Sequence, residues 1–195
     1  MKRIMIAGFV GGVVIFMWGA VAHLATPLGT MGIRQIPDES FVVVSLRNSI
    51  TEKGLYFVPG RDMTKSMTPK DEKVWEEKLK EGPTGLLLVN PAGGEAMSLK
   101  ELGTEFATNI VAALVGAFLI SRVVGSYFSR AFFSMLVGLV GWLSISVPNW
   151  NWYGYPTEFT LAAGIEEVVG GLLAGLVIAW IVPPPDGRKS AVSAI

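Results

Sequence analysis

The sequence contains no cysteine, a single histidine and few charged residues among its 195 positions. Without cysteine, the chain cannot form a disulfide, a thiolate zinc site, an iron–sulfur cluster or a thiol nucleophile. A serine triad would have to use His23 as its base, because no other histidine exists. Charged residues make up 16% of the chain, against about 25% in typical soluble domains. These deficits exclude several enzyme and metal-binding classes and argue against a soluble domain.

Net charge is also lacking. Sixteen basic residues balance sixteen acidic ones, so no overall field attracts nucleic acid, and we expect no nucleic-acid partner. What the chain does have is apolar residues, which make up 51% of it. A composition this apolar and this poor in charge is typical of a membrane protein with a polar portion.

Four apolar stretches are each long enough to cross a bilayer as a helix, which takes roughly 20 residues. They cover residues 4–24, 106–124, 131–147 and 161–182. Residues 25–104, which lie between the first two, hold ten of the sixteen Lys and Arg residues and eleven of the sixteen Asp and Glu residues. We therefore predict an α-helical integral membrane protein with four transmembrane helices and a small extracytoplasmic α+β insert between the first and second.

The predicted organisation has four parts: an N-terminal transmembrane anchor (1–24), the insert (25–104), a three-helix membrane domain (105–183) and a cytoplasmic tail (184–195). The first stretch also resembles a cleavable signal peptide, because Lys2 and Arg3 precede an apolar run that ends in a small-residue motif. That run has about 18 residues, longer than the 7–15 of a signal peptide. Its length favours an uncleaved anchor.

Loop charge predicts the orientation of the four spans. The N-terminus, the loop between the second and third spans and the tail lie on one side, and together they carry six basic residues and one acidic residue. The hairpin at 148–157 carries no charge. Basic residues accumulate on the cytoplasmic side of a membrane. We therefore predict that both termini are cytoplasmic and that residues 25–104 lie outside the cytoplasm.

Within the insert, the sequence predicts two strands and two helices. Residues 55–58 and 86–89 are short apolar runs that end at turn residues, which is typical of strands. A helix begins after Thr68, and Ser98 with Glu101 has the pattern of a capping box for a helix that continues into the second span. So small a unit is marginal in water. We expect it to pack on the membrane domain or on a partner.

Four stretches of the chain together resemble a known family. They are FMWG at 16–19, GLYFVPG at 54–60, NPAGG at 90–94 and SVPNWNWYG at 146–154. Over nearly its whole length the chain is similar to an uncharacterised family of small bacterial membrane proteins with one N-terminal and three C-terminal transmembrane helices. The resemblance implies the bacterial cytoplasmic (inner) membrane and this topology. It implies no activity and no functional residues.

Two adjacent carboxylates, Glu166 and Glu167, lie within the fourth span, about five to seven residues inside its outer end. At the centre of a transmembrane helix a carboxylate costs about 2.5–3.5 kcal/mol. Such residues form an ion or proton site, contact a basic group, or face the bundle at a depth that water reaches. Asn109 in the second span is the third intramembrane polar candidate.

His23 lies near the outer end of the first span and is the candidate for cofactor binding. A haem or pigment held there would need a second ligand or a five-coordinate metal, and space for the macrocycle. The alternative is an interfacial histidine that hydrogen-bonds to a carbonyl or to water near Trp18. We predict no metal site and no cofactor.

Small residues spaced four apart recur in the spans, in the pairs Gly8 and Gly12, Ala112 and Gly116, and Gly171 and Gly175. This spacing lets helix backbones approach closely, either within one bundle or against another subunit.

Aromatic residues concentrate before the fourth span, at Trp150, Trp152 and Tyr153. As a loop, this segment would recognise a sugar, a lipid headgroup or a partner protein, because such residues are enriched in binding hot spots. Alternatively, it forms an aromatic belt at the membrane interface.

No catalytic constellation is evident in the sequence. Our leading hypothesis is a non-enzymatic accessory or scaffold subunit of a membrane complex, whose partners are the bilayer and another membrane protein or further copies of itself. The first alternative is a small transporter or channel component that uses Glu166 and Glu167. The second is an enzyme that acts on a lipid-linked substrate at the outer interface through Glu158, Glu166 or Glu167.

Overall fold

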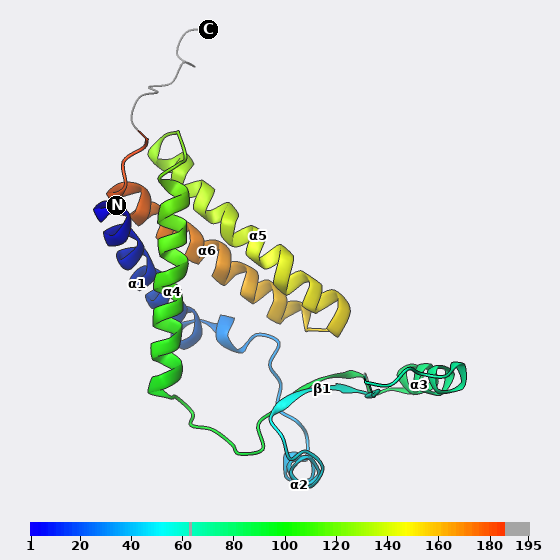
Figure 1. Cartoon of the computed structure of the whole chain (residues 1–195). Helices are drawn as coiled ribbons and strands as arrows, with labels where there is room; N and C mark the ends of the chain where they lie inside the picture. Colours follow the sequence, from blue (N-terminus) through cyan, green and yellow to red (C-terminus); the bar gives the residue numbers. More distant parts are fainter. Residues whose placement is uncertain (63, 186–195) are drawn as a thin grey trace. The chain divides into compact units, whose positions relative to one another are not determined.

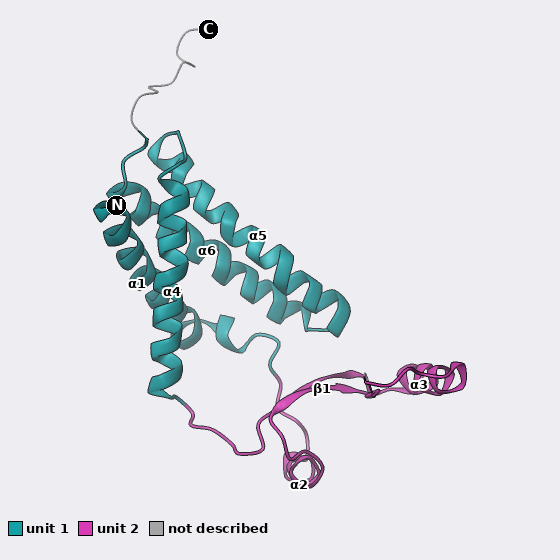
Figure 2. Ribbon diagram, in the orientation of Figure 1, with its two compact units in different colours: residues 1–33, 97–195 teal, residues 34–96 magenta. Residues whose placement is uncertain are grey.

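A computed structural model describes residues 1–62 and 64–185, which are mostly helical (Figure 1). The chain forms two compact units (Figure 2): unit 1 comprises Met1–Ile33 and Met97–Ile195, and unit 2 comprises Arg34–Ala96. Most of the predicted tail at 184–195, including its basic residues, lies outside the described residues. Unit 2 thus interrupts unit 1 along the chain.

Unit 1 contains four helices that are long and apolar enough to cross a membrane, as predicted. They are α1 (Lys2–Ala25), α4 (Leu99–Ile120), α5 (Tyr127–Tyr153) and α6 (Thr157–Ile181), and a short 3₁₀ helix, η1 (Pro27–Thr30), follows α1. The predicted hairpin at 148–157 is wrong in its extent, because α5 continues through Pro148 to Tyr153. Only residues 154–156 connect α5 to α6.

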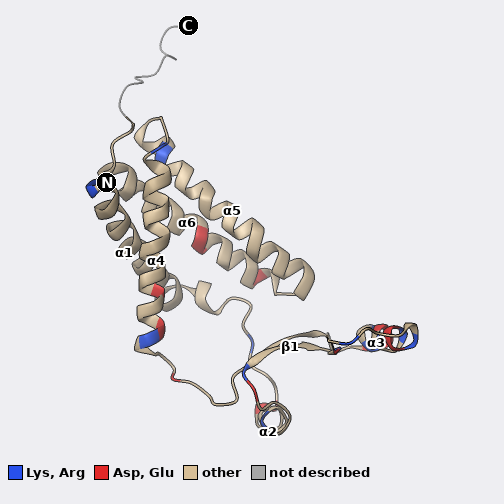
Figure 3. Cartoon of the chain, in the orientation of Figure 1, with Lys and Arg blue, Asp and Glu red and all other residues tan. Residues whose placement is uncertain are grey.

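The four helices pack in the order α4, α1, α6 and α5, with sparse contact between α4 and α5. In Figure 1, α5 and α6 lie side by side, and the start of α1, the α4–α5 loop and the end of α6 lie at one end of unit 1. Lys and Arg residues of unit 1 occur at that end and also at the start of α4 (Figure 3). The start of α1 and the α4–α5 loop thus lie at the same end of unit 1, whereas the basic residues of the tail lie outside the described residues.

Two glycines allow α1 to lie directly against α4. A Cβ atom added at Gly12 would lie 2.5 Å from Ile110 Cα, and one added at Gly8 would lie 2.7 Å from Leu114 Cα. Real Cβ atoms do not approach other atoms this closely, and backbone atoms cannot rotate away. Any side chain at these positions would therefore force the two helices apart.

The other predicted glycine pair has the same role between α6 and α5. A Cβ atom added at Gly171 would lie 2.9 Å from the backbone oxygen of Ser134, and one added at Gly175 would lie 2.7 Å from that of Ala131. The backbones of α5 and α6 thus approach each other at both glycines, as expected for helices whose small residues face a neighbour.

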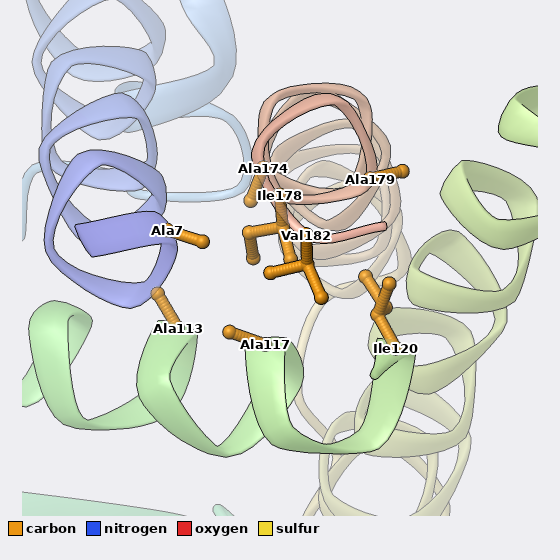
Figure 4. Packing of buried hydrophobic residues seen from close by; sticks show 8 residues of the cluster. All are labelled: Ala7, Ala113, Ala117, Ile120, Ala174, Ile178, Ala179 and Val182. Carbon is orange, nitrogen blue, oxygen red and sulfur yellow. The ribbon is translucent and has the colours of Figure 1, made fainter. Parts of the chain in front are cut away.

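A buried cluster of small and aliphatic residues holds α1, α4 and α6 together near the start of α1 and the end of α6 (Figure 4). It consists of Ala7, Ala113, Ala117, Ile120, Ala174, Ile178, Ala179 and Val182. Four of the eight come from the C-terminal part of α6 and the residue that follows it. Alanine dominates because the helices are too close for larger side chains.

Arg130, in the first turn of α5, lies inside unit 1 with 2% of its surface exposed. Its guanidinium donates to the backbone oxygens of Ile120 at 3.3 Å, Ala179 at 3.4 Å and Pro183 at 3.4 Å. The last carbonyls of a helix have no intrahelical donor and carry partial negative charge. One buried guanidinium therefore donates hydrogen bonds at the C-terminal ends of both α4 and α6.

Unit 2 contains α2 (Glu39–Ser49), β1 (Gly54–Val58), α3 (Pro69–Glu81) and β2 (Gly85–Val89). The two strands pair antiparallel, with Leu55 opposite Leu88. Both predicted strands and the helix after Thr68 are confirmed. None of the described residues of unit 2 is fully buried, and Leu55 and Leu88 are 64% and 79% exposed. This unit therefore has no core of its own.

The structure confirms the predicted start of α3 at Thr68 but not the predicted cap at Ser98. Ser98 precedes α4 but makes no side-chain capping hydrogen bond, so the predicted capping box at that position is wrong. A capping box instead forms at Thr68, whose hydroxyl accepts from the Asp71 backbone N–H at 3.2 Å while the Asp71 carboxylate accepts from the Thr68 N–H. The sequence offers both motifs, and only α3 uses one.

We expect Thr68→Ala to destabilise α3 by about 1 kcal/mol, because an orphan N–H at the helix start loses its acceptor. Amides of the first turn should exchange hydrogen about fivefold faster, which mass spectrometry measures. Ser98→Ala is the matched control at the start of α4 and should leave exchange unchanged, since no cap is lost there. Equal effects of the two substitutions would contradict the assignment of the cap.

Candidate functional site

A cleft of ≈ 570 Å³ lies among the four helices of unit 1. All four helices contribute to its lining, which is mostly apolar. The polar exceptions include three carboxylates and an amide, from Glu105 and Asn109 on α4 and Glu166 and Glu167 on α6. Figure 3 shows acidic residues along both α4 and α6. The sequence candidates Asn109, Glu166 and Glu167 thus line one cleft.

The cleft opens on the side of the helix bundle. α4 is held by α1 and α5 is held by α6, whereas α4 and α5 contact each other sparsely. Among the lining residues, Val115 and Leu119 of α4 and Phe133 and Val137 of α5 are exposed. Exposed apolar side chains on both helices indicate that the opening lies between α4 and α5.

Glu166 is attached to α1 through both its backbone and its side chain. The Trp18 indole Nε1 donates to the Glu166 backbone oxygen at 3.0 Å, and Gly170 leaves room for that indole. His23 Nε2 lies 3.2 Å from Glu166 Oε2, with 31% of the Glu166 side chain exposed. The partner of His23 is therefore a carboxylate, where the sequence suggested a carbonyl or water.

Glu167 turns toward α5 instead. A Cβ atom added at Gly141 would lie 3.0 Å from Glu167 Oε2, and Gly138 accommodates the backbone oxygen of Glu167. Adjacent residues of a helix point about 100° apart, so the two carboxylates line the cleft from different sides.

Both carboxylates lie deeper along the helix than the sequence predicted. α6 begins at Thr157, which places Glu166 and Glu167 about 14–15 Å from its first residue at 1.5 Å per residue. The sequence estimate counted from residue 161, because the preceding residues are more polar. Helix formation extends through them because α5 and α6 pack along each other.

Glu105 is the site residue that the sequence reading missed. A Cβ atom added at Gly19 of α1 would lie 3.6 Å from Glu105 Oε1 and 3.7 Å from Glu166 Oε1, so the two carboxylates converge over this glycine. The predicted boundary at residue 106 excluded Glu105 from the span. Its spacing of four residues from Asn109 was the available signal, since such residues share a helix face.

None of the described lysine or arginine residues lines the cleft. Within the described part of the chain, neither Glu105 nor Glu167 forms an ion pair. No group of three or more His, Asp or Glu side chains in that part is arranged to hold a metal ion. The cleft therefore presents carboxylate charge that the described residues do not neutralise.

The aromatic candidates lie elsewhere. Trp150, Trp152 and Tyr153 occupy the last turns of α5 and not a loop, and they do not line the cleft. Trp150 Nε1 donates to Thr157 Oγ1 at 3.1 Å, while Trp152 is 76% exposed. Glu158 is also absent from the lining. Glu158 and the aromatic segment thus do not converge with Glu166 and Glu167 on the cleft.

Comparison of the chain with protein-family models, with curated proteins and with solved structures gave no match. No site can be assigned to this chain by similarity, so a function has to be argued from the chemistry of the cleft.

Proposed function

We propose that the protein is an accessory subunit of a membrane complex, located in the bacterial inner membrane, and that it binds a partner membrane protein through the cleft between α4 and α5. In this proposal both termini are cytoplasmic and unit 2 lies outside the cytoplasm. The observation that carries the proposal is an open, largely apolar cleft on the side of the bundle that also contains three carboxylates.

Lipid tails and a partner protein differ in what they offer this cleft. A carboxylate facing hydrocarbon costs about 2.5–3.5 kcal/mol at the centre of a span, and lipid tails provide no hydrogen bond to offset that cost. A protein helix supplies polar side chains that do. The carboxylates Glu105, Glu166 and Glu167 therefore favour a protein in the cleft over lipid.

Unit 2 supports the same proposal independently. A two-stranded sheet with exposed apolar residues is marginal in isolation, and none of the described residues in this unit is buried. Apolar surface of this kind is characteristic of an interaction site. An accessory subunit would thus contact its complex both within the membrane and outside it.

Photo-crosslinking from the cleft tests this function in cells that naturally express the protein. A photoreactive residue at Val137, which lines the cleft, should yield an adduct with one membrane protein. The same residue at Val140, exposed on α5 but outside the lining, is the matched control. The adducted protein should also copurify in fixed stoichiometry in mild detergent. Purification as a lone monomer, with lipid adducts only, would overturn the proposal.

A second candidate function is a small transporter or channel component. The convergence of Glu105, Asn109, Glu166 and Glu167 on one cleft favours it, since intramembrane carboxylates mark ion paths. Toward the end of α6, however, the lining includes the buried apolar residues Ile120 and Ile178, which offer no polar group to an ion. Proteoliposomes should show a cation or proton flux that Glu167→Gln abolishes if this candidate is correct.

A further inference from the structure

The shape and the charge of the cleft together specify the segment that fills it. We propose that the occupant is a transmembrane helix of a different protein, with a lysine or arginine at the level of Glu166. This inference rests on the proposed function and adds the chemistry of the partner. It rests on three properties of the cleft. One helix lines it with residues at a helix-packing spacing, some of these residues are small and have no neighbour, and the cleft contains carboxylates without a basic partner among the lining residues.

This row of residues lies on α4. Eight residues of this helix line the cleft, and five of them recur at spacings of four, three, four and three: Glu105, Asn109, Ala112, Gly116 and Leu119. A repeat of seven residues is the pattern along which one helix packs on another. The row covers a rise of about 21 Å at 1.5 Å per residue. A second helix matches this length and period, whereas a compact ligand does not.

In the C-terminal half of this row of residues, Ala112 and Gly116 are small and leave space beside α4 that no other helix fills. Ala112 is exposed, and a Cβ atom added at Gly116 would meet only Ile178 Cδ1, at an ordinary contact distance of 3.9 Å. At Gly8 and Gly12, by contrast, the corresponding space is filled by α4. Small residues four apart allow a partner backbone to approach closely. The Ala112 and Gly116 pair therefore remains available to a helix from outside.

The outer half of the cleft is negative. Glu105 and Glu166 converge over Gly19, and Glu167 lines the opposite side. His23 is the one group of the described residues that contacts any of the three carboxylates with a polar atom, at Glu166. A basic side chain placed there would be paired with carboxylates, which is how charged residues within a membrane are accommodated. Charge complementarity thus selects a cationic helix.

A second copy of this chain does not supply such a helix. In the four apolar helices, Lys and Arg occur only within four residues of a helix end: Lys2, Arg3, Lys100 and Arg130. α6 contains none, and Arg130 is buried against carbonyls. The nearest of them to this level, Lys100, lies five residues before Glu105 on α4, a rise of about 7.5 Å at 1.5 Å per residue, so the cations of a second copy lie toward its helix ends. The partner is therefore a different protein.

The test uses the full-length protein in phosphatidylcholine vesicles and two synthetic probe helices. Each probe is a Leu/Ala helix of about 21 residues, enough to span the bilayer. One carries a single lysine about nine residues from its end, and the other carries leucine there. Because the chain has no native cysteine, Ala112→Cys in the cleft and Val111→Cys outside it report disulfide crosslinking to a probe cysteine at the matching level.

We expect the lysine probe to bind about tenfold or more tightly than the leucine probe, as measured by energy transfer between labelled protein and probe. It should crosslink through Ala112→Cys and not through Val111→Cys. Glu105→Gln combined with Glu166→Gln and Glu167→Gln should remove the preference for lysine. Glu167→Gln alone should reduce it partly, which keeps the test valid if the triple variant does not fold.

Three results would overturn the inference, each in a distinguishable way. Equal binding of both probes, with crosslinking at Ala112→Cys, would overturn the requirement for a cation and leave the proposed function standing. Crosslinking no stronger at Ala112→Cys than at Val111→Cys would overturn both the inference and the proposed docking site. Disulfide-linked dimers of Ala112→Cys formed without a probe would show that a second copy occupies the cleft.

Discussion

Gly12→Leu should lower the free energy of unfolding by about 3 kcal/mol, the upper end of the cost of overpacking a helix contact. The obstacle is the backbone of Ile110, whose Cα atom would lie 2.5 Å from the new Cβ atom. A side-chain obstacle could rotate away, but a backbone obstacle requires α1 to move off α4. Since α4 holds one wall of the cleft, the cleft should also lose its shape.

Thermal unfolding in detergent measures this effect, and about 3 kcal/mol corresponds to a decrease of about 6–12 °C in Tm for a chain of this size. Gly103→Leu is the matched control, because a Cβ atom added at Gly103 of α4 meets nothing within 4 Å. That control should change Tm little. If Gly12→Leu were as stable as the control, the close approach of α1 and α4 would be refuted.

Arg130→Met should lower the free energy of unfolding by about 3 kcal/mol, since hydrogen bonds to charged groups contribute about 1.5–3 kcal/mol. The substitution leaves the backbone oxygens of Ile120, Ala179 and Pro183 without the donor they share. Methionine fills much of the volume, so the loss comes mainly from the guanidinium. Crosslinking between the C-terminal ends of α4 and α6 should fall in parallel.

Arg122→Met is the matched control for Arg130→Met. It tests whether the loss of stability comes from the hydrogen bonds of Arg130 or only from the loss of a positive charge in this region. Arg122 lies in the same loop region, is exposed, and places its guanidinium 5.0 Å from the Phe118 ring centroid. Exposed contacts of this kind contribute about 0.5–1 kcal/mol. Both variants remove one positive charge, so a similar loss of stability in both would contradict the role of Arg130 as a shared cap.

The four apolar helices were predictable because a span is a local property of the chain. About twenty apolar residues in a row identify it without reference to any other segment. Helix ends were less predictable, as α5 shows. Residues 148–153 have the composition of a turn, yet they continue the helix, and Trp150 bonds to Thr157 at the start of α6. Contact with a neighbouring helix decided that boundary.

The candidate site was predictable only in part. Glu166 and Glu167 are conspicuous because charge is rare inside a span, and Asn109 follows from the same argument. Glu105 lies where polar and apolar sequence meet, so the apolar stretch was counted from residue 106 and left it out. The buried position of Arg130 was not predictable either. A basic residue near a span end is expected at the membrane surface, whereas the Arg130 guanidinium lies inside unit 1.

The sequence by itself determined the number and order of the apolar helices, the polar segment between the first two, and the absence of thiol chemistry. These features follow from composition and local periodicity, which do not depend on contacts between distant segments of the chain. Only the tertiary structure decided that Glu105, Glu166 and Glu167 share a cleft. Their convergence depends on Gly12 and Gly138, which let helix backbones approach, and on Gly19, over which Glu105 and Glu166 meet. Such distances between helices are not encoded in any one helix.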